Sequence, residues 1–320
     1  MVNHKSRIVI ALGGNALQAD TKDTTAETQL KTSKETAKPL VDLIEAGHEL
    51  IIAHGNGPQV GQIVATYEAA THSNSSIPVM PFPECGAMSQ GYIGYHLQQA
   101  IREEIHNRGL NKNIATIVTQ VVVDEKDTAF TNPTKPVGSF FTEEEAKKIS
   151  AEKGYVMVED SGRGWRRVVP SPIPVDVVEA PIVKTLVDAG HIVITVGGGG
   201  IPVVEKDGRL QGVPAVIDKD FASEKIAEIL EADYLIILTA VEKVAINFNT
   251  PQQKALDQMT IAETEQYIEE GHFPPGSMLP KVMAALKFVK SKPGRKALIT
   301  SLEKAKEGIE GKTGTTIIGL

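Results

Sequence analysis

Three apolar segments of this 320-residue chain end abruptly at glycine, and this feature limits the possible folds more than any other. The segments are "RIVIAL", "ELIIAH" and "HIVITV". The residues that follow them are Gly13, Gly14 and Asn15, then Gly55, Asn56 and Gly57, then Gly197, Gly198, Gly199 and Gly200. A continuous run of apolar, mostly β-branched residues is typical of a parallel strand that is buried on both faces.

Segments with helical periodicity alternate with strands along the chain. We expect helices over residues 25–46, 58–70, 86–108, 178–189, 220–231, 260–270 and 278–291, further strands over 114–123, 233–241, 296–300 and 315–320, and a hairpin at 202–213. This alternation predicts an α/β fold, with a mostly parallel sheet covered by helices on both faces. Residues 124–174 are rich in turns and charges, and we expect them to form a small inserted subdomain that protrudes from the main body.

The glycine-rich ends of the strands are candidate ligand sites. In open α/β sheets, ligands bind at the carboxyl ends of the strands. Glycine there lets the backbone approach a ligand closely and direct several N–H groups at one anion. A tight turn explains a single glycine pair equally simply, but three such ends on separate strands favour a phosphate site.

Neither common phosphate-binding motif is present. In "GIEGKTG" (308–314) the glycines are too close together for a P-loop, and the segment leads into a strand instead of a helix, so Lys312 is interpreted as a turn residue. "GNGPQVG" has one residue too many for the dinucleotide fingerprint, and no acidic residue ends a following strand at the required distance. An NAD-dependent oxidoreductase is therefore disfavoured.

Two lysines stand where helices are expected to begin. Lys219 precedes Asp220 at the start of one helix, and Lys281 lies in the first turn of another, after Ser277 as the expected cap. A cation at this end opposes the helix dipole by about 0.3–1 kcal/mol, whereas an anion bound there reverses the sign of the argument. Phosphoryl transfer requires such neutralisation of charge. Solvated surface lysines are the alternative explanation.

A basic segment and one further lysine lie in the expected insertion. Lys135, in "NPTKPVG", is either a loop lysine or a rigid arm that carries a charge to the site. Arg163, Arg166 and Arg167 surround Trp165 and form either a charged hairpin face or a nucleic-acid contact. The net charge of −7 favours the hairpin face, because nucleic-acid readers usually carry a basic stripe.

The composition excludes several other classes of protein. With one cysteine, Cys85, the chain forms no intrachain disulfide and no Cys-rich zinc site, and we expect this thiol to pack in the core. His54 could act as a general base, but we interpret it as a packed or capping histidine, which is the more common role. No apolar run approaches 18 residues, so we expect a cytoplasmic protein with no membrane or nucleic-acid partner.

Several blocks of the sequence resemble the carbamate kinases of the amino acid kinase family, over nearly the whole chain. The blocks are "ALGGNAL", "HGNGPQVG", "PTKPVGSFF", "GRGWRRVVPSPIP", "VGGGGIPV", "VIDKDFASEKIA", "LTAVEKVAINF" and "PPGSMLPKV". The glycine-rich blocks are shared across the wider family, whereas "PTKPVG" and "GRGWRRVVPSP" resemble this branch specifically. One departure is Thr128, where the family tends to have proline, and it touches none of the lysines.

The resemblance implies a fold, a reaction and a set of roles. It implies a single domain over 1–320 with a three-layer α/β/α sandwich on a mainly parallel eight-stranded sheet, usually as a homodimer. The implied reaction is ATP + carbamate ⇌ ADP + carbamoyl phosphate with Mg²⁺, making ATP in arginine degradation. The metal ligands stay unassigned. Residues 1–175 would mainly hold the acceptor, and 176–320 the nucleotide.

The roles of single residues also follow from the resemblance. The implied catalytic residues are Lys135, Lys219, Asp220 and Lys281, and the implied carbamate and phosphoryl contacts are Gly13, Gly14, Asn15, Gly55, Asn56 and Gly57. The implied nucleotide contacts are Gly197, Gly198, Gly199, Lys219, Ala240, Phe248, Met278 and Lys281. A kinase of another small anion, such as an acylated amino acid or a nucleoside monophosphate, is one alternative. A non-catalytic nucleotide sensor is another, although it would not need every charge-neutralising group.

Overall fold

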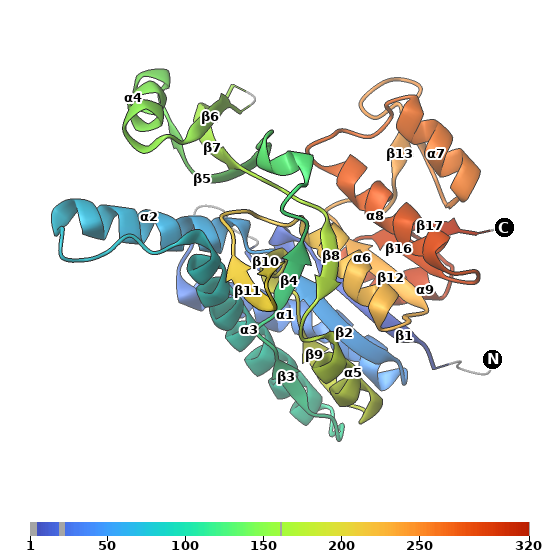
Figure 1. Ribbon diagram of the computed structural model, residues 1–320. Helices are drawn as coiled ribbons and strands as arrows, with labels where there is room; N and C mark the ends of the chain where they lie inside the picture. Colours follow the sequence, from blue (N-terminus) through green and yellow to red (C-terminus); the bar gives the residue numbers. More distant parts are fainter. Residues whose placement is uncertain (1–4, 19–22, 161, 320) are drawn as a thin grey trace.

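The computed structural model describes residues 5–18, 23–160 and 162–319. Its core is an eight-stranded sheet in the order β15-β17-β16-β12-β1-β2-β9-β3 (Figure 1). These strands are β1 (Arg7–Leu12), β2 (Glu49–His54), β3 (Ile114–Thr116), β9 (Ile192–Ile194), β12 (Tyr234–Leu238), β15 (Gln258–Thr260), β16 (Lys296–Thr300) and β17 (Thr315–Ile318). Neighbouring strands are parallel except β16 and β17, which are antiparallel. The predicted mainly parallel sheet is confirmed.

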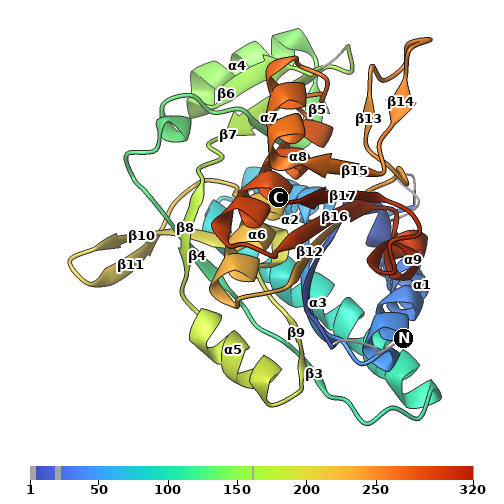
Figure 2. The same cartoon turned by 90° about the vertical axis from the view of Figure 1, so that its right-hand side faces the viewer.

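Helices cover both faces of this sheet, as the continuous apolar strands require. One face packs against α1 (Ala26–Glu45), α3 (Phe82–Asn107) and α9 (Ala305–Ile309). The other packs against α5 (Ala180–Asp188), α6 (Lys219–Ile229), α7 (Ile261–Glu269) and α8 (Met278–Ser291). Figure 2 shows α1 and α9 on the opposite side of β1 and β12 from α5 and α6. Side chains of β1 alternate between the two cores, because successive residues of a strand point to opposite faces.

Two expected boundaries differ from the structure. The helix expected at 86–108 begins at Phe82, because Pro83 is tolerated in a first turn. The single strand expected at 114–123 is wrong. It divides into β3 and β4 (Gln120–Val123), which belong to different sheets. The amide of Gln90 accepts a hydrogen bond from Thr119 N (2.8 Å) and donates one to Thr119 O (3.0 Å), and Thr119 O also accepts from Ile201 N of β10 (2.9 Å), so the chain leaves β3 at this point and joins the other sheet.

Three smaller sheets complete the structure. A four-stranded sheet has the order β11-β10-β4-β8, with β8 (Pro174–Val177), β10 (Ile201–Lys206) and β11 (Arg209–Gly212). Strands β10 and β11 form the predicted hairpin. Strands β13 (Ala245–Ile246) and β14 (Lys254–Ala255) form a second hairpin. Short 3₁₀ turns occur at Gly14–Ala16, Thr128–Phe130, Gly197–Gly199 and Leu302–Lys304.

The third small sheet stands away from the main body and has the order β5-β7-β6. It contains β5 (Lys135–Phe141), β6 (Val156–Glu159) and β7 (Trp165–Val169). Helix α4 (Glu143–Lys153) connects β5 to β6. Figure 1 shows this protruding subdomain above α2 (Gly57–Ser73). Its position corresponds to the expected insertion, and the division of the chain into acceptor and nucleotide halves stays a prediction.

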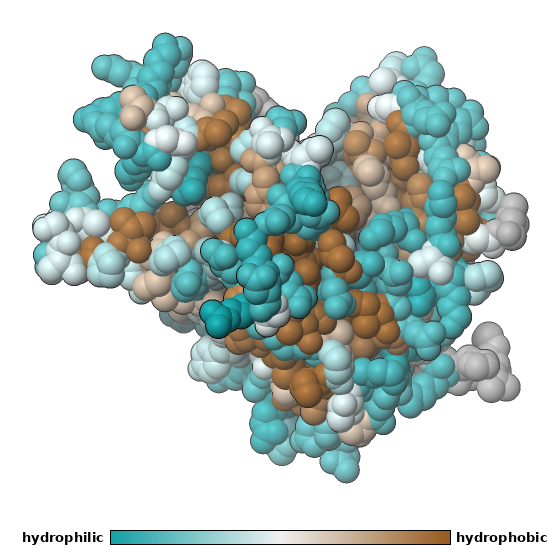
Figure 3. Space-filling view, in the orientation of Figure 1, coloured by the Kyte–Doolittle hydropathy of each residue, from teal (hydrophilic) through white to brown (hydrophobic). Residues whose placement is uncertain are grey.

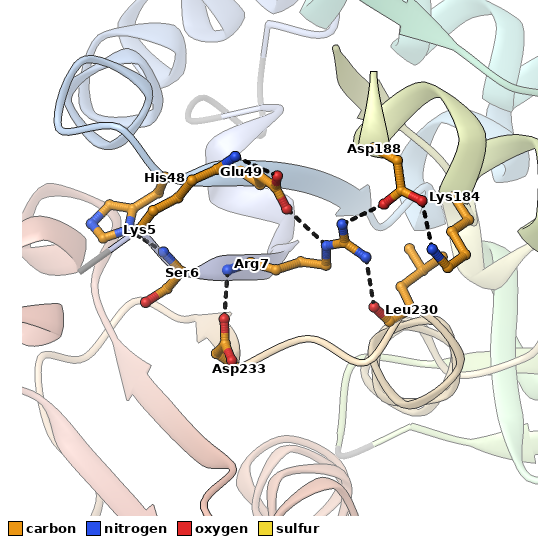
Figure 4. Close-up of polar contacts among 9 residues, drawn as sticks. All are labelled: Lys5, Ser6, Arg7, His48, Glu49, Lys184, Asp188, Leu230 and Asp233. Atoms are coloured by element: carbon orange, nitrogen blue, oxygen red, sulfur yellow. Dashed lines mark hydrogen bonds and ion pairs between the residues drawn. The ribbon is translucent and has the colours of Figure 1, made fainter. Parts of the chain in front are cut away.

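At the amino ends of the strands, Arg7 joins four elements (Figure 4). Its guanidinium donates to Glu49 of β2 (2.9 Å), to Asp188 of α5 (2.6 Å) and to the carbonyl of Leu230 at the end of α6 (3.0 Å). Its backbone N–H donates to Asp233 (2.8 Å). These contacts fix this end of the sheet, opposite the glycine-rich ends. None of the helices described is long and apolar enough to cross a membrane.

Candidate active site

Helix α6 begins beside the carboxyl ends of the central strands. Asp218 is its N-cap residue, and one oxygen of its carboxylate accepts a hydrogen bond from Asp220 N (2.9 Å). Lys219 is therefore the first helical residue, as the sequence predicted. Because the Asp218 carboxylate takes the capping position, the helix start stays stable although a lysine occupies it.

The two lysines predicted at helix starts meet on one carboxylate. Lys219 Nζ binds Oδ1 of Asp220, and Lys281 Nζ lies 2.9 Å from Oδ2 of the same residue. The Asp220 residue is only 2% exposed. Burial raises the pKa of Asp220, but the charges and hydrogen bonds of the two lysines outweigh it and hold the pKa at about 2. Both lysine side chains are largely buried, so neither is an ordinary surface lysine.

Lys219 is in a conflicting environment. Burial lowers its pKa, and Lys281 lowers it further, whereas Asp220 and Asp218 raise it. Burial and a neighbouring cation disfavour the charged form of Lys219, so an anion that enters the site would stabilise that charged form strongly. The arrangement is therefore chemically suited to an anion that approaches the two ammonium groups.

Lys135 reaches this centre from the protruding subdomain. Its Nζ lies 2.6 Å from Oδ2 of Asp218, the oxygen that is not used to cap α6. The β5 strand therefore carries a cation to the N-terminus of α6, which is where the rigid-arm interpretation expects it, and a catalytic role for Lys135 stays a prediction.

The glycine-rich strand ends lie around the same centre. A Cβ built on Gly55 would lie 3.4 Å from the Cδ atom of Lys219, so this glycine lets the lysine pass close to the backbone. A Cβ on Gly13 would lie 3.0 Å from the carbonyl of Leu238 at the end of β12. Asn56 donates to the Ser89 hydroxyl (2.8 Å), and Gly57 begins α2. The Asn15 side chain lies outside what the structure describes.

Two cavities meet at Thr239 and Lys281. One of about 390 Å³ is lined by Gly13, Gly14, Ala16, Lys219, Leu238, Ala240, Ser301, Leu302 and Glu303 together with the shared pair. The other, of about 580 Å³, is lined on one side by Val241, Phe248 and Met278. Both volumes fall near or within the range of small-molecule sites. Three predicted nucleotide contacts, Ala240, Phe248 and Met278, thus come together with the two lysines.

The surface is hollowed above this region. The space-filling view shows a notch between the protruding subdomain and the segment that carries β13 and α7 (Figure 3). Helix α8, which begins at Met278 and carries Lys281, lies on the α7 side (Figure 1).

The remaining predicted nucleotide contacts lie elsewhere. Gly197, Gly198 and Gly199 are buried and line neither cavity. A Cβ on Gly198 would lie 2.1 Å from the Asn56 amide nitrogen, and one on Gly199 would lie 2.1 Å from the carbonyl of Ile217. Gly198 and Gly199 also have positive φ. Close packing under Asn56 and beside the start of α6 explains these glycines, so assigning them to the nucleotide lacks a contact to support it.

Sequence reasoning missed Asp218 and misjudged Ser277. An aspartate directly before a predicted helix is a capping signal, and this signal identifies Asp218. Ser277 occupies the N-cap position of α8, but its side chain makes no capping hydrogen bond. The backbone closes the start of α8 instead, because Leu279 N donates to the carbonyl of Pro274 (3.1 Å) and Pro280 has no N–H to donate.

Two other candidates prove to be structural. His54 is fully buried and donates from Nδ1 to the carbonyl of Gly55 (2.7 Å). Burial lowers its pKa to about 4, so it is neutral at physiological pH and enclosed away from substrate. Cys85 is buried, and burial raises the pKa of its thiol. The interpretations of both as packed residues agree with these positions.

Known proteins with similar sequences and structures identify the family of this chain. Residues 6–301 match the model of the amino acid kinase family. The chain is 60% identical over 312 residues to carbamate kinase of Clostridium perfringens, covering 98% of this chain and 99% of the relative. It is 58% identical over 311 residues to the carbamate kinase-like protein YqeA of Escherichia coli, covering 97% and 98%. The structure of carbamate kinase from Giardia lamblia bound to AMP-PNP has a TM-score of 0.92 at 43% identity and covers 100% of both chains. The chain therefore belongs to the amino acid kinase family, within its carbamate kinase branch.

Proposed function

We propose that this chain is a phosphotransferase that catalyses carbamoyl phosphate + ADP ⇌ ATP + carbamate. The observation that carries the proposal is the convergence of Lys219 and Lys281 on the buried Asp220, between two adjoining cavities. One cavity is bordered by the glycine-rich end of β1, and the other by Phe248 and Met278. This layout offers a phosphate-transfer point with an apolar compartment for a nucleoside beside it.

The two lysines stabilise the group in transfer. A phosphoryl group passing between two acceptors carries negative charge on its equatorial oxygens, and catalysis consists mainly of alignment and charge neutralisation. Lys219 and Lys281 are held ready by Asp220, so they require little reorganisation when the anion enters. Lys135 adds a third cation from the acceptor side.

No protein base is required on the acceptor side. Carbamate is an anion with a free oxygen, so it attacks the phosphorus without losing a proton. His54, the nearest histidine to the strand ends, is neutral and buried. The backbone of Gly13, Gly14 and Gly55 leaves room for a planar anion of this size.

The donor set fits a metal that enters with the nucleotide. Among the described residues, no group of three His, Cys, Asp or Glu side chains is arranged to hold a metal ion. Mg²⁺ in phosphoryl-transfer enzymes is commonly held by substrate phosphates, water and one or two carboxylates. Such an ion would neutralise charge on the β- and γ-phosphate oxygens. We therefore propose MgADP and MgATP as the nucleotide substrates.

A homodimer in the cytoplasm is the assembly that we propose. Val118, Val175, Ile182 and Leu210 are between 41% and 57% exposed. The space-filling view shows a hydrophobic area over β8 and α5 (Figure 3). Exposed apolar patches commonly mark subunit interfaces. Light scattering is expected to give twice the chain mass for the wild type, and Val175→Asp is expected to shift it towards the monomer.

Acceptor profiling tests the proposed reaction. The chain is incubated with MgATP and carbamate, N-acetylglutamate, acetate or UMP, and ADP formation is recorded. We expect carbamate to be used at least a hundredfold more efficiently than the other acceptors. A preference for N-acetylglutamate or UMP would assign the site to another kinase of the family. Formation of ATP in extracts supplied with arginine, lost on deletion, tests the proposed role in arginine degradation.

A further inference from the structure

A separate cavity, of about 270 Å³, lies between α2 and the protruding subdomain, and none of Lys135, Lys219 and Lys281 lines it. Its apolar lining includes Val64, Phe82, Val137, Phe141, Ile149 and Met157. Helix α2 and β5 approach closely beside it, because a Cβ on Gly61 would lie 3.4 Å from the Cα of Gly138. The cavity therefore sits where the protruding subdomain joins the rest of the chain.

Arg167 points a guanidinium group into this apolar setting without a polar partner. Across the described parts of the chain the Arg167 side chain makes neither a hydrogen bond nor an ion pair. Its contacts are aromatic: the guanidinium carbon lies 3.6 Å from the ring centre of Tyr155 and 5.9 Å from that of Phe82. The edges of a guanidinium stacked in this way remain available to an acceptor.

Both neighbouring arginines have a carboxylate partner, although Nε of Arg166 is buried without one, whereas the Arg167 side chain has no polar partner among the described residues. Arg163 and Arg166 both bind the carboxylate of Asp160, at 2.7 Å and 3.3 Å, and Arg166 also donates to the carbonyl of Gly138 (3.1 Å). They lie over the ring of Phe140. The basic segment of the sequence is thus a charged hairpin face, apart from the one arginine that turns inward.

The nearby acidic group does not supply the missing partner. Glu68 also lines the cavity, but its carboxylate accepts from the Tyr155 hydroxyl (3.3 Å) and lies 3.7 Å from Lys153 Nζ. Because Glu68 pairs with Lys153, no acidic side chain that lines this cavity pairs with the guanidinium of Arg167. The Arg167 side chain is half-buried and none of its nitrogens is among the buried atoms without a partner, so water reaches them and an entering anion would replace that water with charge-assisted hydrogen bonds.

We propose that this cavity is a binding site for a small carboxylate with an apolar body. The carboxylate pairs with the two free edges of Arg167, and the apolar body fills the space between Val64, Phe141 and Ile149. A cavity of 150 Å³ accommodates benzene, so 270 Å³ is sufficient for a single ring with a carboxymethyl group. Phosphate alone would leave the apolar wall unfilled.

Binding there acts on the catalytic centre through β5. Arg167 of β7 pairs in register with Val137 of β5, and Lys135 lies two residues before Val137 on that strand. Two residues along a strand span about 7 Å. An occupant that braces Arg167 against α2 therefore restrains the strand that carries Lys135. This second part rests on the proposed function.

Ligand-observed NMR and calorimetry test the site directly, without any kinase activity. The probe is phenylacetate, and phenylacetamide is the neutral control of the same shape. We expect saturable binding of phenylacetate at least tenfold tighter than that of the amide. Arg167→Met is expected to abolish the difference, while Arg163→Gln, which removes an equal charge from the hairpin face, is expected to leave it unchanged.

Several outcomes overturn the proposal. One is the absence of saturable binding to the wild type, and another is equal binding of acid and amide. Binding that persists in Arg167→Met but disappears in Lys219→Ala would place the probe in the catalytic centre. Thermal melting separates a structural role: we expect Arg167→Met to melt no lower than the wild type, because Met fits the apolar lining. A lower melting temperature would instead mark Arg167 as structural.

The effect on catalysis is measured separately. Saturating phenylacetate is expected to change the KM for carbamoyl phosphate at least threefold in the wild type and in Arg163→Gln, and not in Arg167→Met. An unchanged KM in the presence of proven binding contradicts the connection through β5. Failure of the proposed function itself would show as absent turnover with binding intact, so the two failures are distinguishable.

Discussion

The ammonium group of Lys135 lies 2.6 Å from the carboxylate of Asp218, and this pair joins the protruding subdomain to the first turn of α6. The other oxygen of Asp218 caps the helix that begins with Lys219. One carboxylate therefore holds Lys135 through an ion pair and supports the helix start that carries Lys219. The arrangement explains how a residue from the insertion enters a centre built by the main sheet.

Replacing Asp218 by Asn tests this position. Asparagine caps a helix as well as aspartate, so the start of α6 is expected to survive. The charge pair with Lys135 is lost, and we expect kcat/KM for carbamoyl phosphate to fall about 10- to 100-fold, or about 1.4–2.7 kcal/mol. Steady-state kinetics measures the fall, and thermal melting checks the fold.

A double-mutant cycle completes this test. If Asp218 acts through Lys135, Asp218→Asn adds little to the loss already caused by Lys135→Ala. Fully additive losses in the double variant would show that the two side chains act independently and would contradict the account.

Lys281→Ala is expected to reduce kcat about 10²–10³-fold, because one preorganised donor to the developing charge is removed. Asp220 keeps Lys219 as a partner, so the fold is expected to remain intact. Lys290→Ala, in the last turn of the same helix and paired with Glu265 on the surface, is the matched control. Near-wild-type turnover in Lys281→Ala would exclude Lys281 from the mechanism.

His54 predicts a specific dependence of stability on pH. Burial holds its folded pKa at about 4, below the ordinary value of 6.5. The unfolded chain therefore binds a proton that the folded chain refuses between these values, and folding stability falls as pH decreases from 6.5 towards 4. The slope from this residue is about 1.4 kcal/mol per pH unit. Urea unfolding at pH 6.5 and 5.0 is expected to show a smaller decrease for His54→Asn, and equal decreases would refute it.

Arg7→Met tests the far end of the sheet (Figure 4). Glu49 would lose the partly buried guanidinium of Arg7. Asp188 would also lose Arg7 and would keep only Lys184 as an ion-pair partner among the described residues. We expect a loss of about 3 kcal/mol in the free energy of unfolding, with unchanged KM values because the site lies at the opposite strand ends. Lys5→Met removes an exposed partner of the same Glu49, and about 0–1 kcal/mol is expected. Equal losses in both variants would contradict the importance given to burial.

Much of the architecture could be predicted because the determinants are local. Apolar runs ending at glycine located β1, β2 and β9, and helical periodicity over 220–231 located α6 to within one residue of its start. The position of Lys281 in a first helical turn, against the helix dipole, indicated an anion site. These signals depend only on residues that are close in sequence, and the elements that they predict are present in the structure.

Other features depend on contacts between distant segments. The chain between β3 and β4 turns away because Gln90, far away in α3, binds both backbone groups of Thr119. The sequence alone predicts that the glycines at 197–200 contact phosphate. In the structure, position 198 has to be glycine because a Cβ there would collide with the side chain of Asn56. Neither partner is near in sequence, so periodicity and spacing could not reveal them.

The most direct test of the central claim is the rate of ATP formation from carbamoyl phosphate and MgADP, read through a hexokinase-coupled assay, with acetyl phosphate as the control donor. Rapid formation of ATP by the wild type, at least a hundredfold lower in Lys219→Ala at unchanged melting temperature, is the predicted result. A folded wild type that binds ADP but forms no ATP from carbamoyl phosphate would contradict the proposed function. Full activity in Lys219→Ala would contradict the proposed site.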